Sequence, residues 1–340
     1  MKHSIRIHWL DVAKGFAILL VVLGHISFLP TPIRAVIYSF HMPLFFFLSG
    51  FLLFRKEERF GLFLKKKAKT LLWPYYCFLL IQFLVLYFPN KVGFNHAATY
   101  SPGWSALYGD SELWFLLYLF VIQVVLFPIL NRGGGIEKKS LFVILGFMSV
   151  VFLIKGECFS LDVPFEKYRG ATLPFKLDLV FLGGSFVALG ILLRNYLSNN
   201  KFPLWLIGVL LIVAIGAGTW NYQISGKYQV EFFECFVGNP VLFYISSIAS
   251  ILVFVSLCQR IRSLSFVEKF GRYSLSIYAM HWVVVPFVDA VLYRFLVPIA
   301  RDSMLFKSSL ALLSFIIVTA ITFPVVHFIE KKLPWMLGRF

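Results

Sequence analysis

Three ionisable side chains fall within the first long apolar run of the chain, Leu10 to Leu29. Asp11 and Lys14 lie near its start, and His25 lies near its end. Ionisable groups are costly inside a membrane span, so they usually face the bundle interior and serve a function. Lys14 and His25 are eleven residues apart, which is about three helical turns, so both fall near one face, ~16 Å apart along the axis. This pattern predicts a functional stripe with a charge cluster near one membrane face and an imidazole near the other.

A structural interpretation of the same run stays open. Asp11 precedes Lys14 by three residues, so the two can pair and neutralise one another near the membrane surface. His25 can be a packing histidine. The cost of ionisable groups in a membrane favours the functional interpretation.

A second histidine is expected at a similar depth. His41 lies a few residues inside the outer end of the next expected span, 33–54. The tight turn Pro30-Thr-Pro32 makes the two helices antiparallel neighbours. We therefore expect the imidazoles of His25 and His41 to approach one another.

Three residues after His41 shape the same span. Pro43 interrupts the backbone hydrogen bonds locally, and Ser49 with Gly50 permits close helix packing. Packing alone explains them equally well.

Composition places the chain in a membrane. Of its 340 residues, 59% are hydrophobic and only 14% are charged, whereas soluble domains carry about a quarter of charged residues. The net charge of +16 is read as a topology signal from Lys and Arg beside the membrane, so no nucleic-acid partner is expected.

Four cysteines at no metal-like spacing predict no metal site. A disulfide between Cys158 and Cys235, both in expected outer loops, stays open.

The apolar runs predict an all-α, polytopic membrane bundle of about ten helices. The expected spans are 10–29, 33–54, 70–89, 112–130, 140–154, 177–193, 202–220, 240–258, 273–293 and 307–329. Basic residues concentrate in alternate connections, so both termini are expected to be cytoplasmic. The first run is too long for a cleaved signal peptide and is expected to remain as an anchor. Asp178 and Asp289 fall in spans and should face inward. We see no internal repeat, so residues 1–340 are expected to form one domain.

Five motifs in order resemble membrane acyltransferase family 3, which includes sugar and polysaccharide O-acetyltransferases such as fucose 4-O-acetylase-like proteins. They are Asp11 with Lys14-x10-His25; Pro-Leu-Phe-Phe-Phe-Leu-Ser-Gly at 43–50; Lys69-Thr-Leu-Leu-Trp-Pro74; Leu113-Trp-Phe-Leu116; and Gly271-Arg-Tyr-Ser-Leu-Ser-Ile-Tyr-Ala-Met-His281. The chain departs from the family at two points. Lys14 stands where Arg is commoner, and Ser111-Glu112 stands where many relatives have a histidine.

The resemblance implies an O-acetyltransferase, an acyltransferase for groups other than aminoacyl groups, in the bacterial inner membrane. It would move an acetyl group from cytoplasmic acetyl-CoA to a sugar hydroxyl of a surface polysaccharide or lipid-linked glycan. Acetyl-CoA is then a substrate, and no permanently bound cofactor is expected. His25 would be the general base and His41 would orient the substrate or handle its proton. A covalent acyl-His25 intermediate stays open.

Donor and acceptor candidates follow from the same resemblance. On the donor side we expect basic residues at the cytoplasmic mouth, with others along the path: Lys69, Arg272, Lys14, Asp11 and His281. On the acceptor side we expect Glu112 and Trp114 at the outer mouth of the fourth span. The alternatives are a transporter or flippase for an anionic or lipid-linked substrate, and a sensor or scaffold without chemistry. The sequence specifies neither the acceptor sugar and its hydroxyl, nor acetyl over longer acyl groups, nor the oligomeric state.

Overall fold

The computed structural model confirms the expected all-α architecture. It describes residues 7–53, 59–87, 109, 111–131, 135–155, 173–227, 229–261, 263–296 and 303–339. Within these ranges there are helices and no strands. The one backbone pairing of β type among the described residues is an isolated bridge between Glu231 and Phe236.

Seven helical segments in the described part of the chain are long and apolar enough to cross a membrane. They are Thr31–Phe51, Phe60–Val85, Asp178–Asn199, Leu204–Ile224, Pro240–Cys258, Ser274–Leu296 and Met304–Lys332. Three other expected spans contain helices outside this set: α1 (His8–Gly24), α8 (Trp114–Leu130) and α9 (Ile136–Ile154). The first two have 17 residues each, or ~26 Å of helix against a hydrocarbon core of ~30 Å. The multi-pass bundle is confirmed, while the number ten and the side of the termini stay predictions.

The chain divides into two units, each built from separate stretches of sequence. The first contains Met1–Ala17, Ala35–Glu58 and Val121–Arg272, and the second contains Ile18–Arg34, Arg59–Phe120 and Tyr273–Phe340. The boundary passes through α1, so Lys14 belongs to the first unit and His25 to the second. The expectation of one domain over residues 1–340 stays a prediction.

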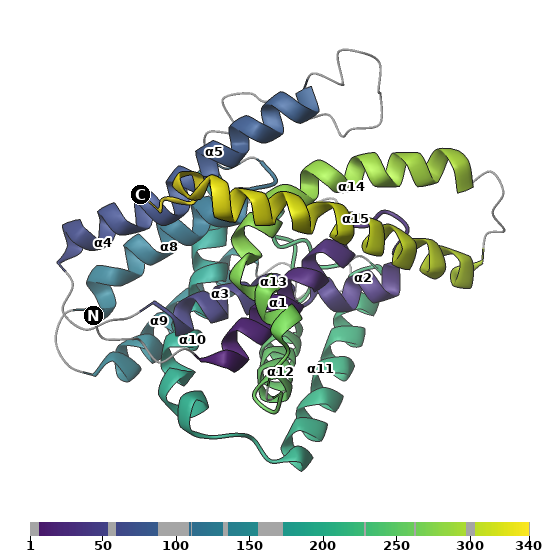
Figure 1. The fold of residues 1–340 in the computed structure, drawn as a ribbon. Helices are drawn as coiled ribbons and strands as arrows, with labels where there is room; N and C mark the ends of the chain where they lie inside the picture. The colour runs from purple at the N-terminus through teal and green to yellow at the C-terminus, as the bar shows by residue number, and fades with distance from the viewer. Residues whose placement is uncertain are drawn as a thin grey trace. The chain divides into compact units, whose positions relative to one another are not determined.

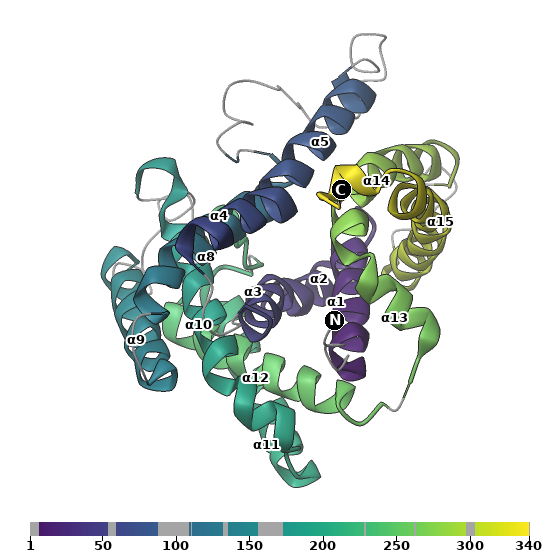
Figure 2. The same cartoon turned by 60° about the vertical axis from the view of Figure 1, so that its left-hand side comes forward.

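In the first unit, α3 (His41–Phe51) and α9 both pack against α10 (Asp178–Asn199), and α11 (Leu204–Ile224) packs along α12 (Pro240–Cys258), as Figures 1 and 2 show. Glycines allow α3 and α10 to approach closely. A Cβ atom at position 50 would lie 2.0 Å from the backbone oxygen of Val187, and one at position 190 would lie 2.0 Å from that of Phe47. The two helices therefore touch through their backbones, which only glycine permits.

In the second unit, α14 (Ser274–Leu296) and α15 (Met304–Lys332) lie side by side (Figures 1 and 2). The same unit contains one continuous helical stretch made of four segments. They are α4 (Phe60–Lys67), the π-helical segment η1 (Ala68–Leu72), α5 (Trp73–Gln82) and the π-helical segment η2 (Phe83–Tyr87). The C-terminal turn η7 (Pro334–Leu337) packs on this stretch, where the indole N–H of Trp73 donates to the backbone oxygen of Trp335 at 2.8 Å.

The third span begins earlier than the sequence indicated. We expected a basic loop as far as Lys69, but the helix begins at Phe60, so Lys65, Lys66 and Lys67 lie on it. No proline interrupts this stretch before Pro74. The π-helical segment η1 ends at Leu72, two residues before that proline. A π turn is a usual way to absorb the missing N–H and the ring clash of a proline without ending the helix.

The contact between α3 and α10 generates a first prediction. We expect Gly190→Ala to lower the free energy of unfolding by about 1–3 kcal/mol, because the added methyl group overpacks the backbone of Phe47. The measurement is thermal unfolding of the purified protein in detergent. Gly208→Ala on α11 is the control, since no atom lies within 4 Å of a Cβ atom at that position, and it should be neutral or slightly stabilising. Equal effects of the two substitutions would contradict the backbone contact.

Candidate active site

His25 lies in the turn directly after the last residue of α1, Gly24. Its ring is half-buried, and its Nδ1 lies 2.7 Å from the backbone oxygen of Val21. A carbonyl oxygen can only accept, so Nδ1 carries the proton and donates. In the neutral ring the lone pair is then on Nε2, and Nε2 is the nitrogen that can act as a base.

Two side chains fix the turn that carries His25. The Asp289 carboxylate accepts the backbone N–H of Ser27 at 2.8 Å through Oδ2 and the hydroxyl of Ser314 at 2.6 Å through Oδ1. The guanidinium of Arg34 donates to the backbone oxygens of Ile26 at 2.7 Å and Ser27 at 3.2 Å. The turn therefore has fixed donors and acceptors on both sides, and the imidazole is preorganised.

A second imidazole lies against the first. The ring centroid of His281, on α14, is 5.0 Å from that of His25. His281 is fully buried, and its Nδ1 donates to the backbone oxygen of Tyr278 at 2.7 Å. Its Nε2 is buried and has no hydrogen-bond partner among the described residues. When both rings are neutral, the two unprotonated nitrogens, Nε2 of His25 and Nε2 of His281, therefore belong to neighbouring rings in the second unit.

A pocket of about 430 Å³ opens beside His25. Its lining includes His25, Ser27, Trp282, Pro286, Asp289 and Tyr293. The ring centroid of Trp282 is 5.0 Å from that of His25. This volume lies in the usual range for small-molecule sites, ~300–1,000 Å³, and the mixture of an apolar wall with a few polar groups is typical of them. The pocket therefore combines a base, a carboxylate and an aromatic face.

The other expected residues of the second unit lie elsewhere in it. The backbone oxygen of Glu112 accepts the hydroxyl of Tyr278 at 2.8 Å, while the Trp114 side chain is buried. Neither lines the pocket beside His25. Lys69 lies in η1, where its backbone oxygen approaches Gly338 so closely that a Cβ atom there would lie 1.9 Å from it. The roles of these residues in substrate binding stay predictions.

In the first unit, α1 crosses α13 (Ser265–Arg272) at two glycines. A Cβ atom at position 271 would lie 1.9 Å from the backbone oxygen of Asp11, and one at position 15 would lie 2.1 Å from that of Val267. This backbone contact fixes the segment of α1 that carries Asp11 and Lys14, and Arg272 is the last residue of α13. It also gives a physical reason for the glycine that opens the Gly271–His281 motif.

His41 begins α3 as a buried residue. Its Nδ1 donates to the backbone oxygen of Ile37 at 2.8 Å, and its ring centroid is 4.8 Å from that of Tyr38. Because His41 belongs to the first unit and His25 to the second, their expected approach stays a prediction. Pro43, Ser49 and Gly50 follow on the same helix, and Gly50 provides the close approach to α10.

Sequence reasoning missed part of this site. Asp289 was expected only to face inward, and Trp282 was not singled out. A signal for Asp289 is present, because it is an ionisable residue on the same expected span as His281 and eight residues after it. No comparable signal distinguishes Trp282 from the other aromatic residues of a chain that is 19% aromatic.

A family model for an acyltransferase domain, that of acyltransferase family 3, matches residues 7–329. The chain belongs to acyltransferase family 3. The resemblance carried by the five motifs is thereby confirmed, and the protein is a membrane acyltransferase. A comparison with curated proteins found no match, and neither did a comparison with solved structures.

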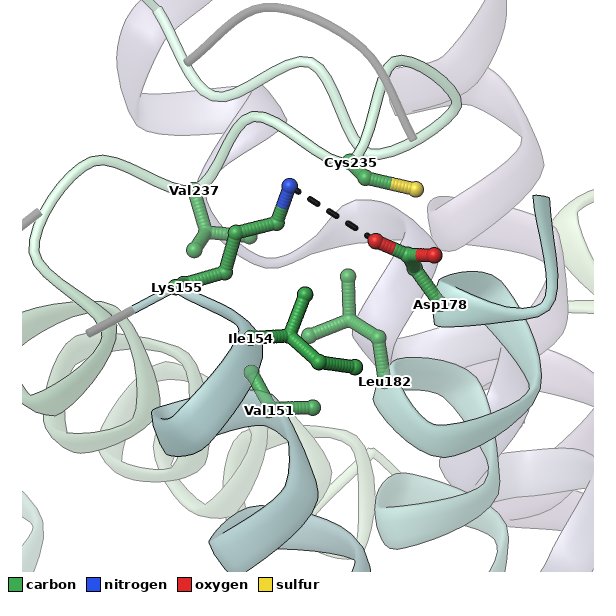
Figure 3. Close-up of a pocket in the computed structure, with 7 residues that line it drawn as sticks. All are labelled: Val151, Ile154, Lys155, Asp178, Leu182, Cys235 and Val237. Atoms are coloured by element: carbon green, nitrogen blue, oxygen red, sulfur yellow. Dashed lines mark ion pairs between the residues drawn. The ribbon is translucent and has the colours of Figure 1, made fainter. Parts of the chain in front are cut away.

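This family 3 acyltransferase has a second buried polar cluster, in its first unit. Figure 3 shows Lys155 and Asp178 pointing toward one another beside the thiol of Cys235; Nζ of Lys155 lies 3.7 Å from Oδ2 of Asp178. Oδ1 of the same carboxylate accepts the backbone N–H of Leu173 at 2.7 Å. The cavity beside it is about 10 Å³, space for at most one water molecule. The cluster is therefore a structural ion pair and not a substrate site.

Cys235 is a buried free thiol in this cluster, and burial raises its pKa to about 12. It is therefore protonated near neutral pH and is a poor nucleophile. The sequence left undecided whether Cys235 pairs with Cys158. Cys158 lies outside the described residues.

The burial of Cys235 generates a second prediction. Only an exposed thiolate reacts with iodoacetamide, so we expect alkylation of Cys235 at pH 8 to be at least about 100-fold slower in the folded acyltransferase than in the protein unfolded in guanidinium, where the thiol pKa is ~8.5. Peptide mass spectrometry measures both rates. Equal rates in the folded and the unfolded protein would show that the thiol is not buried.

Proposed function

We propose that this acyltransferase moves an acetyl group from cytoplasmic acetyl-CoA to a hydroxyl of a sugar in a surface polysaccharide or lipid-linked glycan of the bacterial inner membrane. The observation that carries the proposal is the position of His25 on a pocket, with Nδ1 donating to Val21. That hydrogen bond assigns the base to Nε2. Family membership supports acyl transfer, and the pocket chemistry supports a hydroxyl acceptor.

In the proposed reaction, Nε2 of His25 takes the proton of the sugar hydroxyl as the oxygen attacks the carbonyl carbon of the thioester. The carbon–sulfur bond then breaks, and the coenzyme A thiolate leaves and takes the proton from the imidazolium. General base catalysis of this kind contributes typically 10²–10⁴-fold. If the imidazole instead carries the acetyl group itself, an acetylated His25 should be detectable by mass spectrometry when the acceptor is omitted.

The donor is proposed to meet the basic residues of the cytoplasmic side. Coenzyme A is anionic at its nucleotide end, so Lys69 and Arg272 would attract it and Lys14 would bind a phosphate as a point charge. Asp11 would orient Lys14 from one turn away. His281 contributes a buried nitrogen beside His25.

On the acceptor side, His41 is proposed to orient the substrate or handle its proton. Glu112 and Trp114 are proposed to contact the acceptor at the outer mouth, as the sequence predicted. Membership of an acyltransferase family favours acyl transfer over the transporter or flippase alternative.

The proposal predicts the effect of removing the base. We expect His25→Ala to lower acetyl transfer by about 10²–10⁴-fold, measured with the purified protein, radiolabelled acetyl-CoA and glycan isolated from cells that lack the gene. His8→Ala is the control, because it removes an exposed histidine from the first turn of the same helix, and it should retain activity. Unchanged transfer in His25→Ala, or movement of the glycan across the membrane without label, would refute the proposal.

A further inference from the structure

We propose that the pocket beside His25 is the acceptor subsite and that it selects an uncharged sugar ring. In this assignment Trp282 provides the surface on which the ring lies, and Asp289 accepts hydrogen bonds from ring hydroxyls. The inference rests on the proposed function, because it names the binding residues and the acceptor class of that same site. Its volume, about 430 Å³, is large enough for a sugar ring.

Trp282 is placed to orient the ring against the base. Its side chain is half-buried, it lines the pocket, and its ring centroid lies 5.0 Å from that of His25. One face of a pyranose presents C–H groups, and covering them with an indole removes apolar surface from water on both partners. A sugar on Trp282 would therefore have its hydroxyl edge near the imidazole that takes the proton.

Asp289 has acceptor capacity left for hydroxyl groups. Its side chain is 6% exposed and lines the pocket, and each carboxylate oxygen accepts one hydrogen bond, from Ser27 or from Ser314. An ionised carboxylate offers about four lone-pair sites. Two sites therefore remain for the hydroxyls of a ligand, and hydrogen bonds to a charged acceptor are stronger than neutral ones.

The charge of the residues that line the pocket disfavours anionic groups. Asp289 is the one acidic residue among the described lining residues, and no Lys or Arg is among them. The guanidinium of Arg34 is not part of the lining and donates to the backbone oxygens of Ile26 and Ser27. A second carboxylate or a phosphate would be repelled by Asp289 at low effective dielectric. The same repulsion separates this acceptor pocket from the phosphates of coenzyme A.

The first test compares matched pairs of sugars on the unmodified protein. Methyl glucoside is compared with methyl glucuronide, and methyl galactoside with methyl galacturonide, because each pair differs only at C6, which is a hydroxymethyl group in the neutral sugar and a carboxylate in the acidic one. Saturation-transfer NMR measures binding to the full chain in detergent without acetyl-CoA. We expect the preferred neutral sugar to bind at least tenfold more tightly than its acidic partner. Equal or tighter binding of the acidic partner would overturn the inference.

The second test uses variants and acetyl transfer kinetics. We expect Trp282→Leu to raise the KM for the acceptor about tenfold and Trp282→Phe to raise it less, because Phe keeps an aromatic face. Asp289→Asn should raise the same KM about tenfold and reduce discrimination against the acidic sugar. Ser314→Ala is the matched control, since it removes the hydrogen bond to Oδ1 but keeps the carboxylate, and its KM should change less than threefold.

The outcomes separate this inference from the proposed function. If sugars are acetylated and the Trp282 and Asp289 variants keep the wild-type KM, the subsite is wrong while the acyl transfer stands. If the neutral sugars bind at Trp282 but no sugar is acetylated, the subsite stands and the proposed function fails. If Asp289→Asn and Ser314→Ala raise KM equally and neither changes discrimination, Asp289 only positions the turn and the inference is overturned.

Discussion

The hydrogen bond from the Ser27 backbone to Asp289 is the interaction on which the site depends. A largely buried carboxylate needs hydrogen-bond donors, because a buried charge without them is costly. Asp289 obtains one from the turn after α1 and another from Ser314 on α15. The Asp289 carboxylate thereby fixes the turn that carries His25. The same hydrogen bond satisfies the buried charge and holds the base in position.

One sequence motif serves both units of the chain. Its first residue, Gly271, lets α13 touch the backbone of α1 in the first unit. Its last residue, His281, contributes the buried imidazole beside His25 in the second unit. A single short motif thus combines a packing requirement, which only glycine meets, with a chemical one.

The helices were predictable from the sequence because apolar runs of bilayer length have few other structures available. Their ends were less predictable. α1 was expected to continue to Leu29 but ends at Gly24, before Pro30, and the third span was expected to begin at residue 70 but begins at Phe60. The neighbours of His25 were not predictable, since His281 and Trp282 reach it from more than 250 residues away by packing. The order of residues along the chain suggested His41 as the neighbour of His25.

The central claim is that His25 removes the proton of an acceptor bound in its own pocket. The most direct measurement is a cryo-EM structure of the full chain in lipid nanodiscs with coenzyme A and the preferred methyl glycoside. The account predicts one sugar hydroxyl within about 3.2 Å of Nε2 of His25, with the ring on Trp282. A glycoside bound elsewhere, with no hydroxyl within reach of that nitrogen, would contradict it.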